Sequence, residues 1–154
     1  MQTQVIPMKD LAELITLQLE KGGRAKLTVT GFSMRPMLHE RRDSVVLIPV
    51  RQRQSVGDVI LYLRENGQYV LHRIIAVEEC GYICSGDNQA MREPVSHSQL
   101  LGVMESFTRK GKTYTVRSFG YRIYTAACVH LFFLRKCYLA VRRPLGRLCA
   151  QWKK

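Results

Sequence analysis

Acidic residues are missing from the last third of this sequence. Residues 1–107 contain all 12 Asp and Glu and half of the 24 Lys and Arg, so they carry no net charge. Residues 108–154 contain the other half of the cations and no acid, so the net charge of +12 belongs to them alone. We expect such a segment to bind phosphate groups, either of nucleic acid or of anionic lipid.

Long apolar runs are also missing. No stretch reaches the roughly 18 apolar residues of a transmembrane helix, so none is expected. Asp10, Glu13 and Glu20 interrupt the apolar residues near the start, which is not typical of a secretory signal. The 5 cysteines are an odd number at irregular spacing, and this excludes a regular disulfide framework. We therefore expect reduced thiols, and we predict no metal and no cofactor.

Hydrophobic periodicity divides these 154 residues into three parts. Helical spacing predicts an N-terminal helix within residues 1–25, with Asp10 as its N-cap and Gly22-Gly23 as its end. A period of two predicts a β-rich domain over residues 26–117. The strands are expected at Leu27–Thr30, Ser44–Ile48, Val59–Leu63, Tyr69–Val77, Tyr82–Ser85, Leu100–Phe107 and Thr113–Arg117.

The spacing of the expected strands predicts a mainly β fold. Asn66-Gly67 is a strong hairpin turn signal between the third and fourth strands. Glycines and polar residues separate the strands at short, even intervals, which is typical of a rolled antiparallel sheet or barrel.

Residues 118–154 are predicted to form a basic amphipathic helical tail. One arc of this helix is apolar and contains Ile123, Ala127, Leu134, Tyr138, Val141 and Leu145, whereas arginine and lysine occupy the other side. This pattern favours peripheral attachment to an anionic membrane through residues 119–154. In one alternative, the apolar arc packs on the β-rich domain and the protein is cytoplasmic. In the other, less favoured alternative, the cations bind nucleic acid.

Ser33 is a candidate nucleophile, because it lies in a turn between Gly31 and Pro36 just after a strand. Such a turn exposes the hydroxyl and leaves a backbone N–H beside it for an oxyanion. The sequence has no lysine between Lys26 and Lys110, so histidine is the better candidate for a base. His72 lies inside a strongly apolar strand, and the neighbouring Arg73 is expected on the opposite, solvated face.

Four short motifs in order make the chain similar to a known family. They are Ser33-Met-Arg-Pro36-Met-Leu38, Gly57-Asp58-Val59, His72-Arg73-Ile74 and Gly86-Asp87-Asn88. In this order the chain resembles the signal peptidase I superfamily of serine peptidases, which includes the self-cleaving LexA-type repressors. The resemblance covers residues 27–105, and histidine in the third motif is typical of the archaeal, endoplasmic-reticulum and sporulation-type branch.

The resemblance implies roles for the residues in these motifs. Ser33 would be the nucleophile, and its backbone N–H would stabilise the oxyanion. His72 would be the general base, and Asp87 would support the site and orient the base. Glu93 is a possible third member, because the branch usually has an aspartate near this position.

The resulting prediction is a serine endopeptidase that removes a leader or signal segment from a peptide or preprotein. The peptide would lie extended along a strand edge, and Met34 and Met37 would either floor the substrate pocket or fill the core. With neutral His72 as the base, activity should rise with pH through roughly 6–7. Relatives have an N-terminal transmembrane anchor, whereas the predicted N-terminal helix is short and acidic.

Two other functions remain open from the sequence. One is a nonenzymatic binding module that uses the cationic tail on lipid or nucleic acid. The other is a LexA-like self-cleaving regulator, which fits poorly because residues 1–26 show no helix-turn-helix pattern and the lysine base is missing.

Overall fold

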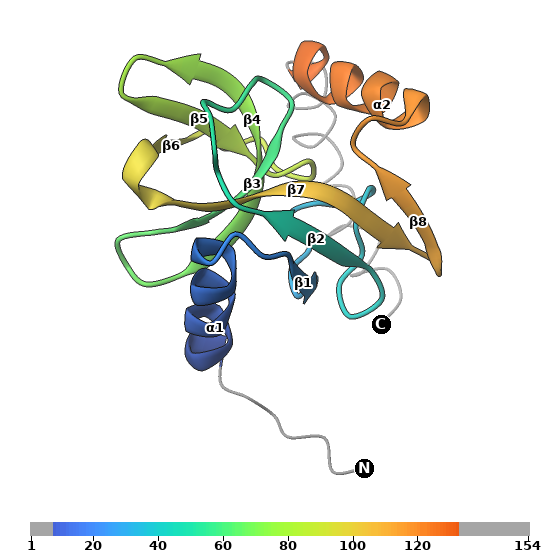
Figure 1. Ribbon diagram of the computed structural model, residues 1–154. Coiled ribbons are helices and arrows are strands. Elements are labelled where there is room, and N and C mark those ends of the chain that lie inside the picture. The colour runs from blue at the N-terminus through green and yellow to red at the C-terminus, as the bar shows by residue number, and fades with distance from the viewer. Residues whose placement is uncertain (1–7, 133–154) are drawn as a thin grey trace, which may run out of the picture.

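The computed structural model describes residues 8–132 of the chain. Eight antiparallel strands form one curled sheet, with a short helix near each end of this region (Figure 1). The elements are α1 (Met8–Glu20), β1 (Ala25–Thr28), β2 (Ser44–Ile48), β3 (Val59–Leu63), β4 (Tyr69–Glu78), β5 (Gly81–Ser85), β6 (Glu93–Ser96), a 3₁₀ turn (His97–Gln99), β7 (Leu100–Arg109), β8 (Lys112–Thr115) and α2 (Phe119–His130). The mainly β, rolled antiparallel fold predicted from the sequence is confirmed.

Most predicted elements lie where the periodicity placed them, and β2 and β3 have the predicted bounds. One strand, β6, was not predicted, because it has only 4 residues and contains Pro94, which the edge position of the strand tolerates. Asp10 lies inside α1, since the helix begins at Met8, so the predicted N-cap is wrong.

The strand order of the sheet is β1-β2-β7-β3-β4-β5-β6. The long strand β7 is central, because β2 pairs with one of its edges while β3 and β8 share the other. β1 and β6 are the two ends of this order. Within residues 8–132 the outer edge of β1, beside the segment that contains Ser33, is therefore unpaired.

The hairpin of β3 and β4 sets the register of the histidine strand. Gly67 has a φ of 79°, a left-handed conformation that glycine adopts without strain, as the Asn66-Gly67 signal predicted. Ile60 is directly opposite His72, and Tyr62 is opposite Val70. Tyr62 and His72 are therefore diagonal neighbours on one face of the hairpin, which is close enough for long side chains to meet.

The curled sheet buries both faces of β3. Val59 and Leu61 belong to the larger core, whereas Ile60 and Tyr62 belong to a second cluster beneath β5 and β6. Removing this apolar surface from water is the main driving force for the curled shape. Tyr62 is consequently enclosed, with an exposed fraction of 0%.

Helix α2 packs on the β-rich domain with a face other than the predicted apolar arc. Tyr121 is buried at 8% exposure and contacts the core. Ile123 is 56% exposed, and Ala127 is also exposed. Both belong to the arc that was expected to be the apolar face of the tail, so this arc is open to solvent along the described part of the helix. The remaining members of the arc lie outside the described residues.

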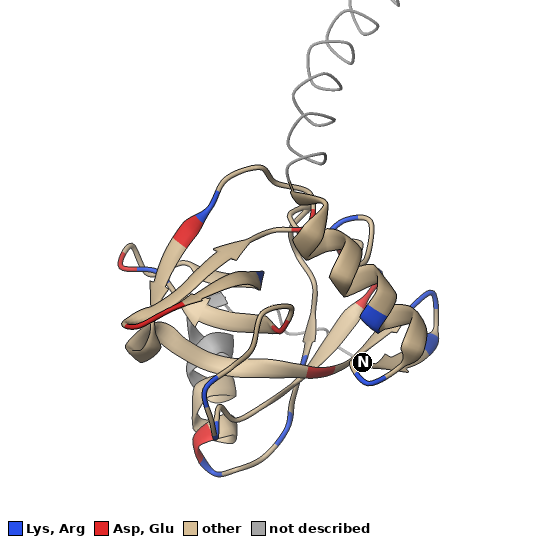
Figure 2. Cartoon of the chain, turned by 90° about the horizontal axis from the view of Figure 1, so that it is seen from above, with Lys and Arg blue, Asp and Glu red and all other residues tan. Residues whose placement is uncertain are grey.

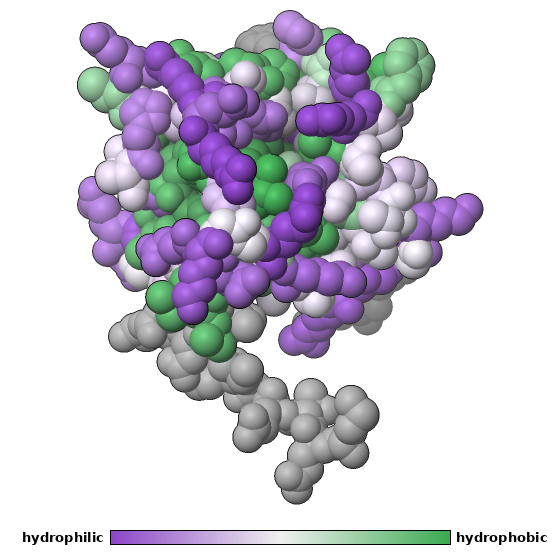
Figure 3. All heavy atoms as spheres, viewed as in Figure 1, coloured by the Kyte–Doolittle hydropathy of each residue, from purple (hydrophilic) through white to green (hydrophobic). Residues whose placement is uncertain are grey.

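Charges of both signs are interspersed over the described residues (Figure 2). α2 itself contains one arginine, Arg122, and no acid, so most cations of the predicted tail lie outside the described residues. Hydrophobic surface is visible over α1 in the space-filling view (Figure 3), where Leu14 and Leu17 are exposed. Within residues 8–132 no helix is long and apolar enough to cross a membrane.

Candidate active site

Ser33 lies in the turn that connects β1 and β2. Buried side chains on its C-terminal side, Met34 at 1% and Leu38 at 0% exposure, hold this turn against the core. The Leu38 N–H donates to the Met34 carbonyl at 2.9 Å, which closes the turn. Ser33 remains half-buried, and neither its N–H nor its hydroxyl forms a hydrogen bond within residues 8–132. Both groups are therefore available to a substrate.

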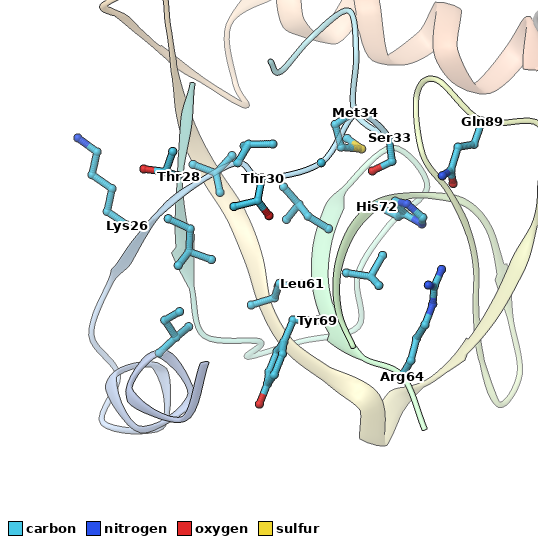
Figure 4. Close-up of a pocket in the computed structure, with 17 residues that line it drawn as sticks. Lys26, Thr28, Thr30, Ser33, Met34, Leu61, Arg64, Tyr69, His72 and Gln89 are labelled. Atoms are coloured by element: carbon cyan, nitrogen blue, oxygen red, sulfur yellow. The ribbon is translucent and has the colours of Figure 1, made fainter. Parts of the chain in front are cut away.

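Gly86 brings Ser33 and His72 to the same space. A Cβ placed on Gly86 would lie 2.9 Å from Ser33 Cβ and 3.1 Å from His72 Nε2. The serine side chain and the Nε2 edge of the imidazole thus both border the glycine, and Figure 4 shows them side by side at one end of a cleft. Catalytic hydrogen bonds are commonly long in uncomplexed enzymes, so this arrangement suits a nucleophile and its base.

The other edge of the imidazole contacts a tyrosine. The Tyr62 hydroxyl lies 3.1 Å from His72 Nδ1 and donates to Glu93 Oε2 at 2.8 Å. Glu93 Oε2 itself is 3.9 Å from Nδ1. Arg64 donates to both oxygens of Glu93. The candidate third residue Glu93 thus reaches the histidine through Tyr62.

The surroundings of His72 favour a neutral imidazole. Burial lowers the pKa of His72 to about 4, and the nearby Arg64 adds to this effect, although Glu93 and Asp87 act in the opposite direction. The hydrogen bonds from Arg64 hold the pKa of Glu93 below its usual value, so this residue is a carboxylate. At neutral pH the site therefore combines a neutral histidine with an ionised glutamate.

Asp87 is bonded to Arg73. Its two oxygens accept from Arg73 Nε and Nη2, both at 2.8 Å, and the Tyr124 hydroxyl donates to Oδ2 at 3.0 Å. Its carboxylate thus pairs with Arg73, whereas the Tyr62 hydroxyl lies at His72 Nδ1. The role of Asp87 in supporting the site and orienting the base stays a prediction.

The expectation that Arg73 is solvated is wrong. Its exposed fraction is 1%, because helix α2 covers this face of β4. Arg73 Nη1 donates to the Gly57 carbonyl at 2.8 Å and to two α2 hydroxyls, Tyr121 at 3.1 Å and Thr125 at 3.0 Å. Burial alone would lower the pKa of Arg73, but the Asp87 carboxylate more than offsets it and leaves the pKa raised.

A cleft of about 510 Å³ extends from Ser33 and His72 along β1 (Figure 4). Its lining is largely apolar and includes Ile15, Leu27, Val29, Met34, Val45, Leu61 and Leu71. Met34 therefore borders the candidate substrate pocket, as one of its two predicted roles requires. Met37 does not line this cleft: it is 3% exposed, and its sulfur accepts from Arg73 Nη2 at 3.4 Å. Of its two predicted roles, the structure supports core filling.

Three residues of the site were not found from the sequence: Tyr62, Arg64 and Gln89. Gln89 lines the cleft near Ser33, and its Oε1 is buried with no hydrogen-bond partner in the described part of the chain. Tyr62 could have been found from the register of the predicted hairpin, because this register makes Tyr62 a diagonal neighbour of His72. Nothing in the sequence pattern indicated Gln89.

No group of three His, Cys, Asp or Glu side chains within residues 8–132 is placed to hold a metal ion. The cysteines in this range, Cys80, Cys84 and Cys128, form no disulfide with one another.

No protein-family model, curated protein sequence or solved structure matches the chain. The resemblance to the signal peptidase I superfamily therefore remains a prediction from the four motifs, and the functional argument depends on the geometry of the site.

Replacing Asp87 by Asn should destabilise the fold, because the Arg73 charge would stay buried without its counterion. Breaking a buried pair in this way costs about 3–5 kcal/mol. Urea unfolding of the two proteins measures the difference. As a control, Glu105→Gln removes the partner of the solvent-exposed Arg24 and should change stability little. An Asp87→Asn protein as stable as the wild type would contradict the structural role.

Proposed function

We propose that this protein is a serine endopeptidase of the signal peptidase type, which cleaves a leader or signal segment from a peptide or protein substrate. The observation that carries the proposal is the meeting of Ser33 and His72 Nε2 at Gly86, at one end of an apolar cleft. A nonenzymatic binding module would have no use for this arrangement.

The proposed reaction is acyl transfer. Ser33 Oγ attacks the carbonyl carbon of the scissile peptide bond while its proton moves to His72 Nε2. The Ser33 N–H donates to the oxyanion that forms on the carbonyl oxygen. The imidazolium then gives its proton to the leaving amine as the C–N bond breaks. Water hydrolyses the acyl-enzyme by the same route, with His72 again taking and returning the proton.

The open edge of β1 suits an extended peptide. Val29 N–H donates to the Asp43 carbonyl and its C=O accepts from Arg41 N–H, so the backbone of Val29 points toward the neighbouring loop. Because backbone groups alternate along a strand, Thr28 and Thr30 direct theirs toward the unpaired edge. A peptide added there as a further strand would place its side chains in the apolar cleft and its carbonyl near Ser33.

We further propose that the enzyme works at an anionic membrane surface through residues 119–154. The support is the exposed apolar surface of α2, where Phe119 and Ile123 are 78% and 56% exposed, together with the cations that follow in the sequence. A cytoplasmic location with no membrane contact is the alternative.

Ser33→Ala should abolish cleavage, because alanine has no nucleophile. We expect new protein N-termini in cells that contain the wild-type chain, and we expect them to be missing with Ser33→Ala, as measured by N-terminal peptide profiling. Ser55→Ala, in an exposed loop, is the matched control and should behave like the wild type. Identical profiles for wild type and Ser33→Ala would instead favour the binding module.

Activity should rise with pH through about 4, because the pKa of buried His72 is lowered to about 4 and only the neutral imidazole accepts the serine proton. Full activity is thus expected above that pH and should be lost as the pH falls through it. The pH dependence of kcat/KM measures this midpoint. A midpoint at pH 6–7, as expected for an ordinary histidine, would contradict the lowered pKa of His72. Activity retained by His72→Ala would show that His72 is not the base.

Gly86→Ala should separate the nucleophile from the base, since the added methyl would lie 2.7 Å from the Ser33 carbonyl oxygen and 3.1 Å from His72 Nε2. A displacement of this kind costs on the order of 10²-fold in rate. The comparison is kcat/KM against the control Gly120→Ala, whose methyl would meet nothing within 4 Å. Circular dichroism checks that both proteins are folded. Wild-type activity in Gly86→Ala would show that the reaction does not use this space.

A further inference from the structure

Tyr62 lies between the candidate base and the carboxylate that a serine peptidase would use to orient it. We propose that Tyr62 is a positioning residue: its hydroxyl accepts from His72 Nδ1–H and donates to Glu93, so that the site is a serine–histidine–tyrosine–glutamate chain. This inference rests on the proposed function and specifies how the base is oriented.

The distances require an intermediary. Glu93 Oε2 is 3.9 Å from His72 Nδ1, which is too long for a hydrogen bond. The Tyr62 hydroxyl bridges this gap with contacts of 3.1 Å to Nδ1 and 2.8 Å to Oε2. Its ring is fully buried in the second core cluster, so the hydroxyl is held rigidly in place.

The ionised Glu93 determines which group donates in each of these hydrogen bonds. Arg64 binds both Glu93 oxygens and keeps the group ionised, so the carboxylate can only accept hydrogen bonds. The Tyr62 proton therefore points to Glu93, and the lone pairs of its oxygen are left for His72 Nδ1–H. This selects the tautomer in which Nε2 is unprotonated and faces Ser33, the form that a general base needs.

Charged and titratable groups approach the imidazole from several elements. They are Tyr62 and Arg64 from β3 and the loop after it, Asp87 from the loop after β5, Glu93 from β6 and the Ser33 side chain from the turn before β2. Cys84 from β5 acts on Tyr62. Of these, Glu93 and Asp87 favour the imidazolium that forms during the reaction, and Arg64 opposes it. The Glu93 carboxylate orients the Tyr62 O–H, and the oxygen end of this dipole faces His72 Nδ1. Tyr62 keeps its proton throughout.

The test is Tyr62→Phe in the full chain, with ¹⁵N NMR of the labelled imidazole at neutral pH as the first readout. We expect the wild type to show the Nδ1–H tautomer, and Tyr62→Phe to shift the population toward Nε2–H. We expect kcat to fall about 10²-fold, the lower end of what a positioned base contributes, with KM unchanged. Tyr82→Phe is the matched control, because it removes another buried hydroxyl, one that accepts from Gln54 N–H at 3.0 Å.

A double-mutant cycle with Glu93→Gln tests whether Glu93 acts through Tyr62. Glu93→Gln alone should lower kcat, because it removes the charge that fixes the direction of the Tyr62 hydroxyl. In the Tyr62→Phe background the same change should have little further effect, since the connection is already broken. If the two losses in kcat were fully additive, the proposed connection from Glu93 through Tyr62 to His72 would be overturned.

The tautomer readout needs no turnover, so it separates this inference from the proposed function. Nε2–H in the wild type would overturn the inference, as would an unchanged tautomer and wild-type kcat in Tyr62→Phe, even if Ser33→Ala abolishes cleavage. Should Tyr62→Phe fail to fold, the wild-type tautomer and the Glu93→Gln protein still decide. If the protein shows the expected Nδ1–H tautomer of His72 but cleaves no substrate, the geometry is correct and the peptidase proposal is wrong.

Discussion

The buried ion pair between Arg73 and Asp87 connects the parts of the molecule that the site needs. Arg73 belongs to β4, directly beside His72, and Asp87 directly follows Gly86, the glycine that borders both His72 and Ser33. The same guanidinium contacts Met37 in the serine turn and two hydroxyls of α2. A charge removed from water must satisfy all its hydrogen bonds, so the groups around Arg73 are held in one arrangement. That constraint positions the nucleophile turn against the histidine strand.

The two faces of β4 therefore have opposite electrostatic characters. On one face, Arg73 stays charged because a buried carboxylate lies against it. On the other, His72 is desolvated with a hydroxyl as its nearest partner, so the neutral form is favoured. Adjacent residues of one strand carry a charged guanidinium and a neutral imidazole because side chains alternate across the sheet. The Tyr62 hydroxyl lies between Glu93 and His72, so the Glu93 carboxylate does not contact the imidazole directly.

The sequence was informative wherever the signal was local. Short apolar runs located β2 and β3, and Asn66-Gly67 located the hairpin that brings Tyr62 beside His72. It was uninformative where burial depends on a distant segment. Arg73 was expected in solvent because a strand face has no visible cover until α2, some 50 residues later, packs on it. For the same reason, the Gly86-Asp87-Asn88 motif did not reveal that the Asp87 carboxylate pairs with Arg73.

The class of fold, the turn that contains Ser33, and histidine as the candidate base were all accessible from the sequence. Periodicity, glycine and proline positions, and the lack of lysine between Lys26 and Lys110 can be read directly along the chain. The tertiary structure decided which carboxylate serves which cation, that Gly86 borders both Ser33 and His72, and that Tyr62 stands between His72 and Glu93. These are contacts between segments far apart in the chain. They depend on how the sheet curls and on what covers each face, which no local pattern specifies.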